Sequence, residues 1–381
     1  MGILPNILFV LALILGVGYF TRNIRKIIRN IRLGKAADVS GPSAERWKNM
    51  ARIALGQQKM VVRPVSGFLH IIVYLGFVII NIEVLEIILD GVFGTHRIFS
   101  FMGGFYDFLI GSFEILALLV IIAVVVFWIR RNALRLQRFW KPEMKGWPKK
   151  DADLILYIEV ILMGLFLTMN AADFRLQEMG VEHYNQAGAF PVSSYIAGWM
   201  SGWSATTLIA IERVAWWLHI LGILFFLNYL YFSKHLHILL AFPNTYFGRL
   251  KPQGQFNNLV AVQKEVALMM DPNADPFAAP AEDAPLPEKF GASDVMDLNQ
   301  IQLLNAYTCT ECGRCTSECP ANQTGKKLSP RKIMMDTRDR LEEVGRHLDS
   351  LKGKWEPDGK QLLDDYISRE ELWACTSCNA C

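Results

Sequence analysis

Seven cysteines carry the most specific chemistry in this sequence, and they lie in two short runs near its C-terminal end. The first run, Cys309 to Pro320, has the spacing C-x2-C-x2-C-x3-C-P, which is typical of thiolates that bind a [4Fe–4S] cluster. The second run, Cys375 to Cys381, repeats C-x2-C-x2-C. Zinc is the main alternative, but zinc ribbons use paired C-x2-C knuckles. The spacing therefore predicts two iron–sulfur clusters. Their predicted ligands are Cys309, Cys312, Cys315, Cys319, Cys375, Cys378 and Cys381.

The two runs are expected to exchange one ligand. In two-cluster ferredoxins the fourth cysteine of a run binds the other cluster, so we expect Cys319 to complete the cluster of the second run. The first cluster then needs a cysteine beyond residue 381. We therefore expect the sequence to be cut inside its second run, and a longer version to continue with x3-C-P. Because every cysteine lies in these runs, none remains for a disulfide.

By composition, the chain that positions the cysteine runs has three parts. Residues 1–240 are strongly apolar, residues 241–294 read as a linker with one short helix near Asn257–Met270, and residues 295–381 are polar and hold both cysteine runs. A helix needs about 20 residues to cross a bilayer. Five apolar stretches are long enough, approximately Ile3–Phe20, Gly67–Leu89, Phe105–Ile129, Leu154–Ala171 and Thr207–Phe232. The first is not a cleaved signal peptide, because its basic residues follow the apolar run.

Local signals predict that the C-terminal part is helical too. Ser329-Pro330 opens a helix that should run to about Leu348, and the capping-box pattern from Ser368 to Glu371 starts a short turn that leads into Cys375. The predicted fold is mainly α, with a five-helix transmembrane bundle followed by a mostly helical [4Fe–4S] ferredoxin domain.

Basic residues predict the orientation in the membrane. They crowd the segment after the first span and the connection from the third to the fourth, whereas the loops 91–104 and 172–206 hold one arginine each, Arg97 and Arg175. By the positive-inside rule, the N-terminus lies outside and the cysteine runs lie in the cytoplasm, where thiols stay reduced. The net charge of +3 sums basic loops and a nearly neutral remainder, so nucleic acid is not expected as a partner. Contact of the basic loops with anionic lipid suffices to explain them.

Histidines at membrane depth are candidate haem ligands, because ionisable groups are costly there. His70 starts the second span and His237 ends the fifth, so this topology gives both the same cytoplasmic depth. That pair predicts one b-type haem. Alternatively, each histidine bonds a backbone carbonyl and has no cofactor.

His219 predicts a second haem less directly. It precedes His237 by 18 residues, which is five turns of a continuous helix, so both would share one face. The matching positions on the second span, Ile80 and Asn81, are poor ligands. Its partner would be a methionine or an outer-loop histidine; these are Met163, Met169, His96 and His183.

Three carboxylates in the outer halves of the spans, Glu83, Glu86 and Glu114, could pass protons between water and a quinone. The alternative is that they pair with Arg213 or His219 and only hold helices together. The nearby tryptophans are interpreted as an interfacial belt rather than a stacking site. These are Trp199, Trp203, Trp216 and Trp217.

On these residues, the chain resembles two known families. Residues 1–240, with five spans, His70, and the pair His219 and His237, resemble the cytochrome b fold of the respiratory nitrate reductase gamma subunit and of the heterodisulfide reductase membrane subunit. Residues 290–381, through CTECGRCTSECP and ELWACTSCNAC, resemble the ferredoxin part of heterodisulfide-reductase-like and glycerol-3-phosphate-dehydrogenase-type iron–sulfur subunits. This sequence lacks the second-span histidine of the outer haem. It also lacks the cysteine-rich CCG domains of these families, which would then lie past residue 381 or on a separate subunit.

The resemblance implies an oxidoreductase subunit in a bacterial or archaeal cytoplasmic membrane. It would pass electrons between a cytoplasmic redox subunit, either a flavoprotein or a CCG-domain iron–sulfur protein, and the quinone pool, through two [4Fe–4S] clusters and b-type haem. The chief alternative is a haem-free iron–sulfur membrane anchor that docks a catalytic partner subunit. An iron–sulfur redox sensor is a third hypothesis.

Overall fold

A computed structural model describes residues 3–252, 255, 258–273, 289–379 and 381. Within these residues the chain is helical and has no strand, only isolated bridges such as the one between Lys35 and Asn299. The α-helices are α1 (Ile3–Ile31), α2 (Ser43–Met50), α3 (Pro64–Phe93), α4 (Gly104–Trp128), α5 (Trp147–Glu178), α6 (Ser193–Trp199), α7 (Ala205–Tyr229), α8 (His237–Tyr246), α9 (Val260–Met270), α10 (Gln300–Thr308), α11 (Arg314–Glu318), α12 (Pro320–Gln323), α13 (Pro330–Ser350), α14 (Leu362–Asp365) and α15 (Arg369–Trp373). The mainly helical fold class is confirmed.

Five helices are long and apolar enough to cross a membrane, and they contain the five predicted stretches. They are α1, α3, α4 with the π-helical turn Ile129–Ala133, α5, and α7 with the 3-10 turn Leu230–Phe232. Each is longer than its apolar run, because polar residues continue the helical hydrogen bonding beyond it. The short helix of the linker begins at Val260; Asn257 lies outside the described residues.

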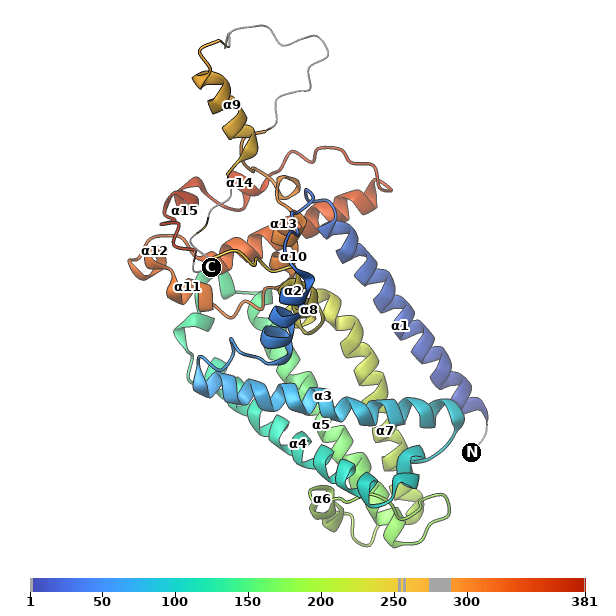
Figure 1. The fold of residues 1–381 in the computed structure, drawn as a ribbon. Coiled ribbons are helices and arrows are strands. Elements are labelled where there is room, and N and C mark those ends of the chain that lie inside the picture. Colours follow the sequence, from blue (N-terminus) through green and yellow to red (C-terminus); the bar gives the residue numbers. More distant parts are fainter. Residues whose placement is uncertain (1–2, 253–254, 256–257, 274–288, 380) are drawn as a thin grey trace. The chain divides into compact units, whose positions relative to one another are not determined.

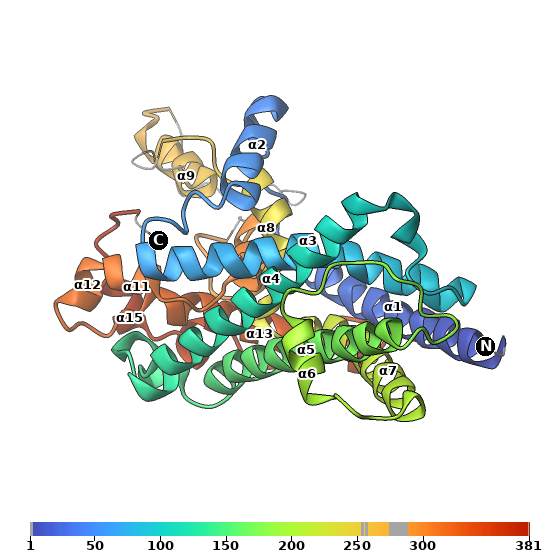
Figure 2. The same cartoon turned by 90° about the horizontal axis from the view of Figure 1, so that it is seen from below.

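Contacts divide the chain into two compact units, and the first consists of Met1–Arg25 and Arg52–Leu236. In it α5 packs against α7 and α4, and α4 packs against α3, so these four helices lie side by side (Figures 1 and 2). Their shared core includes Phe113, Phe166 and Ile220. At Gly91 of α3, an added Cβ would come within 2.6 Å of the Phe9 ring, so α1 approaches α3 closely only because this residue is glycine.

The fifth span does not continue as one helix to His237. The α-helix α7 ends at Tyr229, Ser233 is extended (φ −118°, ψ 145°), and α8 begins only at His237. Asp151 at the start of α5 accepts hydrogen bonds from Tyr229 Oη and from the backbone N–H of Lys234, which holds the bend. The prediction that His219 and His237 share one face of a continuous helix is therefore wrong.

The second unit consists of Lys26–Ala51 and His237–Cys381, so part of the basic segment after the first span belongs with the C-terminal residues. Lys26 and Arg29 pair with Asp349 of α13, and the Asn30 amide donates to Tyr307 Oη at 3.0 Å. An added Cβ at Gly345 would come within 2.4 Å of Asn30. Basic residues that the sequence analysis explained by topology and lipid contact thus also build this unit.

The two helix starts predicted in the C-terminal part are confirmed. Helix α13 begins at Pro330, with Ser329 before it, and runs two residues past the predicted Leu348 to Ser350. Ser368 and Glu371 form the predicted capping box, in which each side chain accepts from the other residue's backbone N–H. The short helix α15 then ends at Trp373, immediately before the second cysteine run.

Candidate functional site

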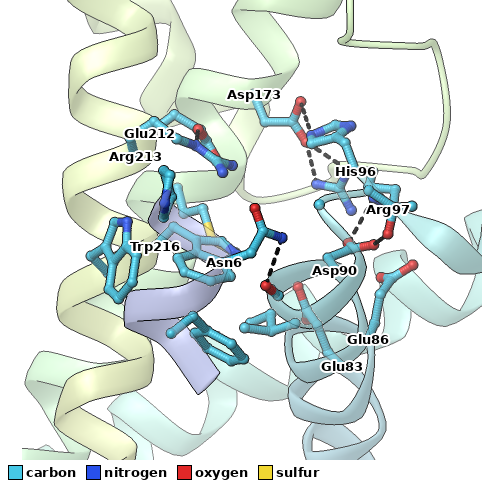
Figure 3. Close-up of a pocket in the computed structure, with 18 residues that line it drawn as sticks. Asn6, Glu83, Glu86, Asp90, His96, Arg97, Asp173, Glu212, Arg213 and Trp216 are labelled. Carbon is cyan, nitrogen blue, oxygen red and sulfur yellow. Dashed lines mark hydrogen bonds and ion pairs between the residues drawn. The ribbon is translucent and has the colours of Figure 1, made fainter. Parts of the chain in front are cut away.

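A cavity of about 280 Å³ lies in the first unit, between the start of α1, the end of α3 and the middle of α7. Figure 3 shows Asn6 of α1 between α7 and α3, and its amide donates to the carbonyl of Gly91 at 3.0 Å. Two of the three predicted carboxylates, Glu83 and Glu86, line this cavity. Its other polar lining residues are Asn6, Asp90, Thr95, His96, Arg97, Asp173, Glu212 and Arg213.

Arg97 organises one wall of the cavity. Its Nε donates to Asp173 Oδ2 at 2.6 Å, its other nitrogens donate to Tyr106 Oη at 3.1 Å and Asn170 Oδ1 at 3.0 Å, and only 7 % of the residue is exposed. Burial opposes its charge, but the Asp173 carboxylate, Tyr106 and Glu83 together outweigh burial and raise the pKa of Arg97 above its usual value. A fixed positive charge therefore stands beside the buried carboxylates.

The three predicted carboxylates have different environments. Glu86 accepts from the Phe99 backbone N–H at 2.9 Å and from Tyr106 Oη at 2.8 Å. Glu114 is fully buried, does not line the cavity, and accepts from the backbone N–H groups of Val192 and Ser193. Glu83 Oε2 is buried and has no hydrogen-bond partner among the described residues. The bonds of Glu114 hold the loop before α6, so of the three carboxylates only Glu83 and Glu86 lie at the cavity.

The alternative pairing of these carboxylates with Arg213 or His219 is not found in the described chain either. Arg213 pairs with its neighbour Glu212, which also accepts from Tyr184 Oη at 3.1 Å. His219 Nδ1 lies 3.0 Å from the carbonyl oxygen of Leu162. Glu83 and Glu86 are therefore not helix-fastening ion pairs of the kind expected.

The four tryptophans separate into two groups. Trp199 is 84 % exposed and Trp203 is 44 % exposed, as expected for an interfacial belt. Trp216 is buried, and Trp216 and Trp217 line the cavity, where Phe9 lies 5.4 and 6.1 Å from their rings. The belt interpretation is therefore wrong for Trp216 and Trp217, which give the cavity an aromatic wall.

The geometry of His219 fits a metal-ligating histidine. A carbonyl oxygen can only accept, so Nδ1 of His219 carries the proton toward Leu162, and Nε2 keeps its lone pair. Ligating histidines commonly donate their other N–H to a backbone carbonyl in this way. The ring is 2 % exposed and lies 6.1 Å from the Phe166 ring.

The other histidines are placed as follows. His70 lies in α3 of the first unit, and His237 begins α8 of the second, so each is described within its own unit. Their pairing on a haem stays a prediction. His96 and His183 contact each other, with ring centroids 5.4 Å apart.

The two cysteine runs have the same backbone pattern. The second and fourth residues after the first cysteine of each run have positive φ: 55° and 73° at Glu311 and Gly313, and 54° and 57° at Ser377 and Asn379. Alternation of right- and left-handed residues turns successive backbone N–H groups to one side, a conformation that recurs around anions and iron–sulfur clusters. Both runs therefore fit cluster-binding loops, and all seven cysteines are free of disulfides.

Packing brings the end of the first run to the start of the second. Cys319 is buried in a small cluster with Ala321 and Leu328, against which Ala374 packs. Ala374 directly precedes Cys375. This is the proximity that the predicted exchange of Cys319 requires. In the first run, Glu311 is fixed by Arg338 of α13, whose guanidinium donates to it at 2.9 Å.

Sequence reasoning missed Arg97 and Asp173 as site residues, and it considered His96 only as a possible haem ligand. Arg97 had been noted only as one of the few basic residues in an outer loop. A lone arginine beside a histidine, directly after a span with three acidic residues, was the signal that could have found them.

Comparisons with known proteins agree with the cluster assignment. Residues 308–381 match the family described as 4Fe-4S dicluster domain. The chain is 28 % identical over 98 % of its length to the probable iron-sulfur-binding oxidoreductase FadF of Bacillus subtilis, of which it covers 52 %. It is 25 % identical over 89 % of its length to the EtfAB:quinone oxidoreductase of Syntrophomonas wolfei, of which it covers 46 %.

A shorter match links the chain to a third protein. Over 26 % of its length it is 32 % identical to a probable membrane-anchored ferredoxin of Chromohalobacter salexigens, of which it covers 16 %. No solved structure matches. The chain spans about half the length of the two longer relatives. It thus combines a 4Fe-4S dicluster domain with helices suited to a membrane.

Proposed function

We propose that this protein passes electrons between a cytoplasmic redox partner and a quinone in the membrane. One observation carries the proposal: a chain with a dicluster domain also has, among its membrane helices, a cavity that combines an aromatic wall with buried carboxylates. A quinone has a flat ring suited to aromatic contact and two oxygens that gain or lose protons. The printed name of one relative, EtfAB:quinone oxidoreductase, points the same way.

The cofactors of this function would be held by the residues that the sequence singled out. The seven cysteines would supply ligands to two [4Fe–4S] clusters, His70 and His237 would hold one b-type haem, and His219 would bind a second. When bound, these groups supply one-electron transfer. The chain's own part is to orient the ligands, through bonds such as His219 to Leu162, and to provide proton-exchanging groups beside the quinone.

The proposed location is a bacterial or archaeal cytoplasmic membrane, with the N-terminus outside and the dicluster domain in the cytoplasm. Charge supports this orientation, because the basic residues crowd two loops that lie on one side of the five spans. The cavity then faces the outer half of the membrane, and the partner would be a soluble flavoprotein or a CCG-domain iron–sulfur protein.

The test uses the full-length protein, purified with its cofactors and reduced with dithionite under anaerobic conditions. We expect an added oxidised menaquinone analogue to reoxidise the clusters. The oxidation state of the clusters is monitored by electron paramagnetic resonance. Clusters that a soluble acceptor reoxidises and the quinone does not would refute the quinone function.

The same preparation tests the haem ligands. A reduced-minus-oxidised spectrum should show a b-type α-band, and haem content should fall in His70→Ala and His237→Ala. Partial loss in His219→Ala as well would indicate two haems. Intact protein without haem would leave the iron–sulfur anchor as the function.

A further inference from the structure

Two buried polar atoms without hydrogen-bond partners in the described chain belong to residues that line the cavity. They are Oε2 of Glu83 and Nδ1 of His96. Glu83 is 97 % buried, with 3 % of its surface exposed. Because leaving a buried polar group unpaired costs about 1–3 kcal/mol, such atoms are retained where a ligand or a proton completes them. Both are of kinds that exchange protons.

We propose that His96 exchanges a proton with the head group of a quinone in this cavity, that Asp173 positions its ring, and that His183 connects it to solvent. The proposal rests on the quinone function proposed above and names the groups that carry its protons. His96 is the catalytic residue, Asp173 a positioning residue and His183 a relay.

The geometry around His96 leaves one nitrogen for the substrate. Its Nε2 lies 3.4 Å from Asp173 Oδ1, and the other oxygen of Asp173 is bonded to Arg97. A carboxylate can only accept, so the proton of neutral His96 sits on Nε2 and the lone pair on Nδ1. Figure 3 shows Asp173 between His96 and Arg97, with both interactions drawn. This arrangement orients the ring and stabilises the imidazolium once Nδ1 takes up a proton.

The reaction balances as follows. Oxidation of a quinol to the quinone releases two electrons and two protons, and reduction takes up the same number. The electrons would be exchanged one at a time with the [4Fe–4S] clusters that the cysteine runs would hold. One quinol O–H bond breaks as an N–H bond forms at Nδ1 of His96, and the other proton passes to Oε2 of Glu83; reduction reverses both transfers.

His183 gives His96 a route to water. Its ring is exposed and its centroid lies 5.4 Å from that of His96, a separation that one water or a rotation of the exposed ring can bridge. Burial, then the neighbouring His96 and Arg213, lower the pKa of His183, so its neutral form is favoured and can accept a proton. The other titratable groups facing this pair are Asp173, Tyr184 and Glu212.

The experiment is rapid mixing of the oxidised full-length protein with a reduced menaquinone analogue, with cluster reduction recorded across a pH series. His96→Gln should slow electron transfer about a hundredfold, the usual scale of a general base, and added imidazole should restore part of the rate. Asp173→Asn should slow it less and shift the pH profile. His183→Gln should slow electron transfer, and this loss should be larger at low than at high buffer concentration. The control Glu182→Gln, at the exposed neighbouring residue, should react like the unaltered protein.

Cluster and haem content, measured on each variant, establish that it has folded. If the unaltered protein does not react with quinol or quinone, the function proposed above fails as well. If it reacts and His96→Gln keeps the full rate and pH profile, only the role of His96 fails. A slowed His96→Gln that has lost haem, or that imidazole does not restore, also overturns the proposal. Should His96→Gln not fold, His183→Gln decides, since a rate equal to that of Glu182→Gln contradicts the relay.

Discussion

Each unit of this protein buries one arginine among carboxylates, yet the two networks differ in completeness. Arg340 in α13 is fully buried and bonds both Asp294 and Asp358, each through two oxygens, as well as the carbonyl of Lys360. Asp294 and Asp358 also accept backbone N–H groups. Around Arg97, by contrast, the network ends at a cavity where Glu83 Oε2 and His96 Nδ1 have no partner in the described chain.

The difference indicates what each network does. A network whose donors and acceptors are all matched fixes a fold, because any change of protonation or ligand would break existing bonds. A network that leaves proton-exchanging atoms at the edge of a cavity can complete them with a substrate. We therefore assign Arg340 to stability and the surroundings of Arg97 to chemistry, and the predictions below test that division.

The largest expected effect is on stability, at Arg340. Arg340→Met removes the buried cation from the partly exposed carboxylates of Asp294 and Asp358, and losing hydrogen bonds to charged groups costs about 1.5–3 kcal/mol. We expect thermal unfolding of the full-length protein, followed by helical circular dichroism, to show a loss of this size in the unit that holds α13.

The same helix offers a matched control. Arg346 is 69 % exposed and lies 3.7 Å from Glu342 one turn away, so Arg346→Met should cost less than about 0.5 kcal/mol. Equal effects of the two substitutions would break the assignment of Arg340 to stability.

A second prediction separates two carboxylates of the first unit. Glu114→Gln should cost about 1–3 kcal/mol and leave the reaction with quinone unchanged. Its Oε2 accepts two backbone N–H groups, and its Oε1 accepts the amide of Asn170, which cannot turn over because its own oxygen is taken by Arg97. The measurements are the unfolding midpoint and the rate of cluster reoxidation by a menaquinone analogue.

Glu83→Gln is the counterpart of this variant. Because Glu83 Oε2 has no hydrogen-bond partner to lose among the described residues, the free energy of unfolding of Glu83→Gln should stay within about 1 kcal/mol of that of the unaltered protein. Its reaction with quinone should slow at least tenfold, since an amide cannot exchange the proton. The reverse pattern, a stable and reactive Glu83→Gln beside an inactive Glu114→Gln, would exchange the roles of the two residues.

Much of the fold could be predicted because its signals are local. Apolar length identified the five spans, and Ser329-Pro330 and the pattern from Ser368 to Glu371 marked two helix starts to the residue. The bend after Tyr229 could not be predicted, because no glycine or proline marks it. It depends on Asp151, which lies 78 residues earlier in the chain than Tyr229.

The site was predictable only in part for the same reason. Burial at membrane depth singled out Glu83 and Glu86, and both line the cavity. Composition cannot show that Glu114 is saturated by backbone N–H groups from another loop, or that Trp216 faces inward. Nor does it show that His96 meets Asp173, since they come from a loop and a helix 77 residues apart in sequence.

The smallest expected effect concerns pH and the Arg340 network. The hydrogen bond from Arg340 lowers the pKa of Asp358 to about 2, below the value of about 3.9 in an unfolded chain. The stability that Asp358 adds is therefore complete above about pH 4 and is lost only as pH falls toward 2. Asp358→Asn should lower the unfolding free energy by about 1 kcal/mol or less, because the Asp358 side chain itself is partly exposed to solvent. This difference should be the same at pH 8 and at pH 5. If this free-energy difference instead shrank between pH 8 and pH 5, Asp358 would titrate near neutrality. The Arg340 network would then exchange protons as the cavity is proposed to do.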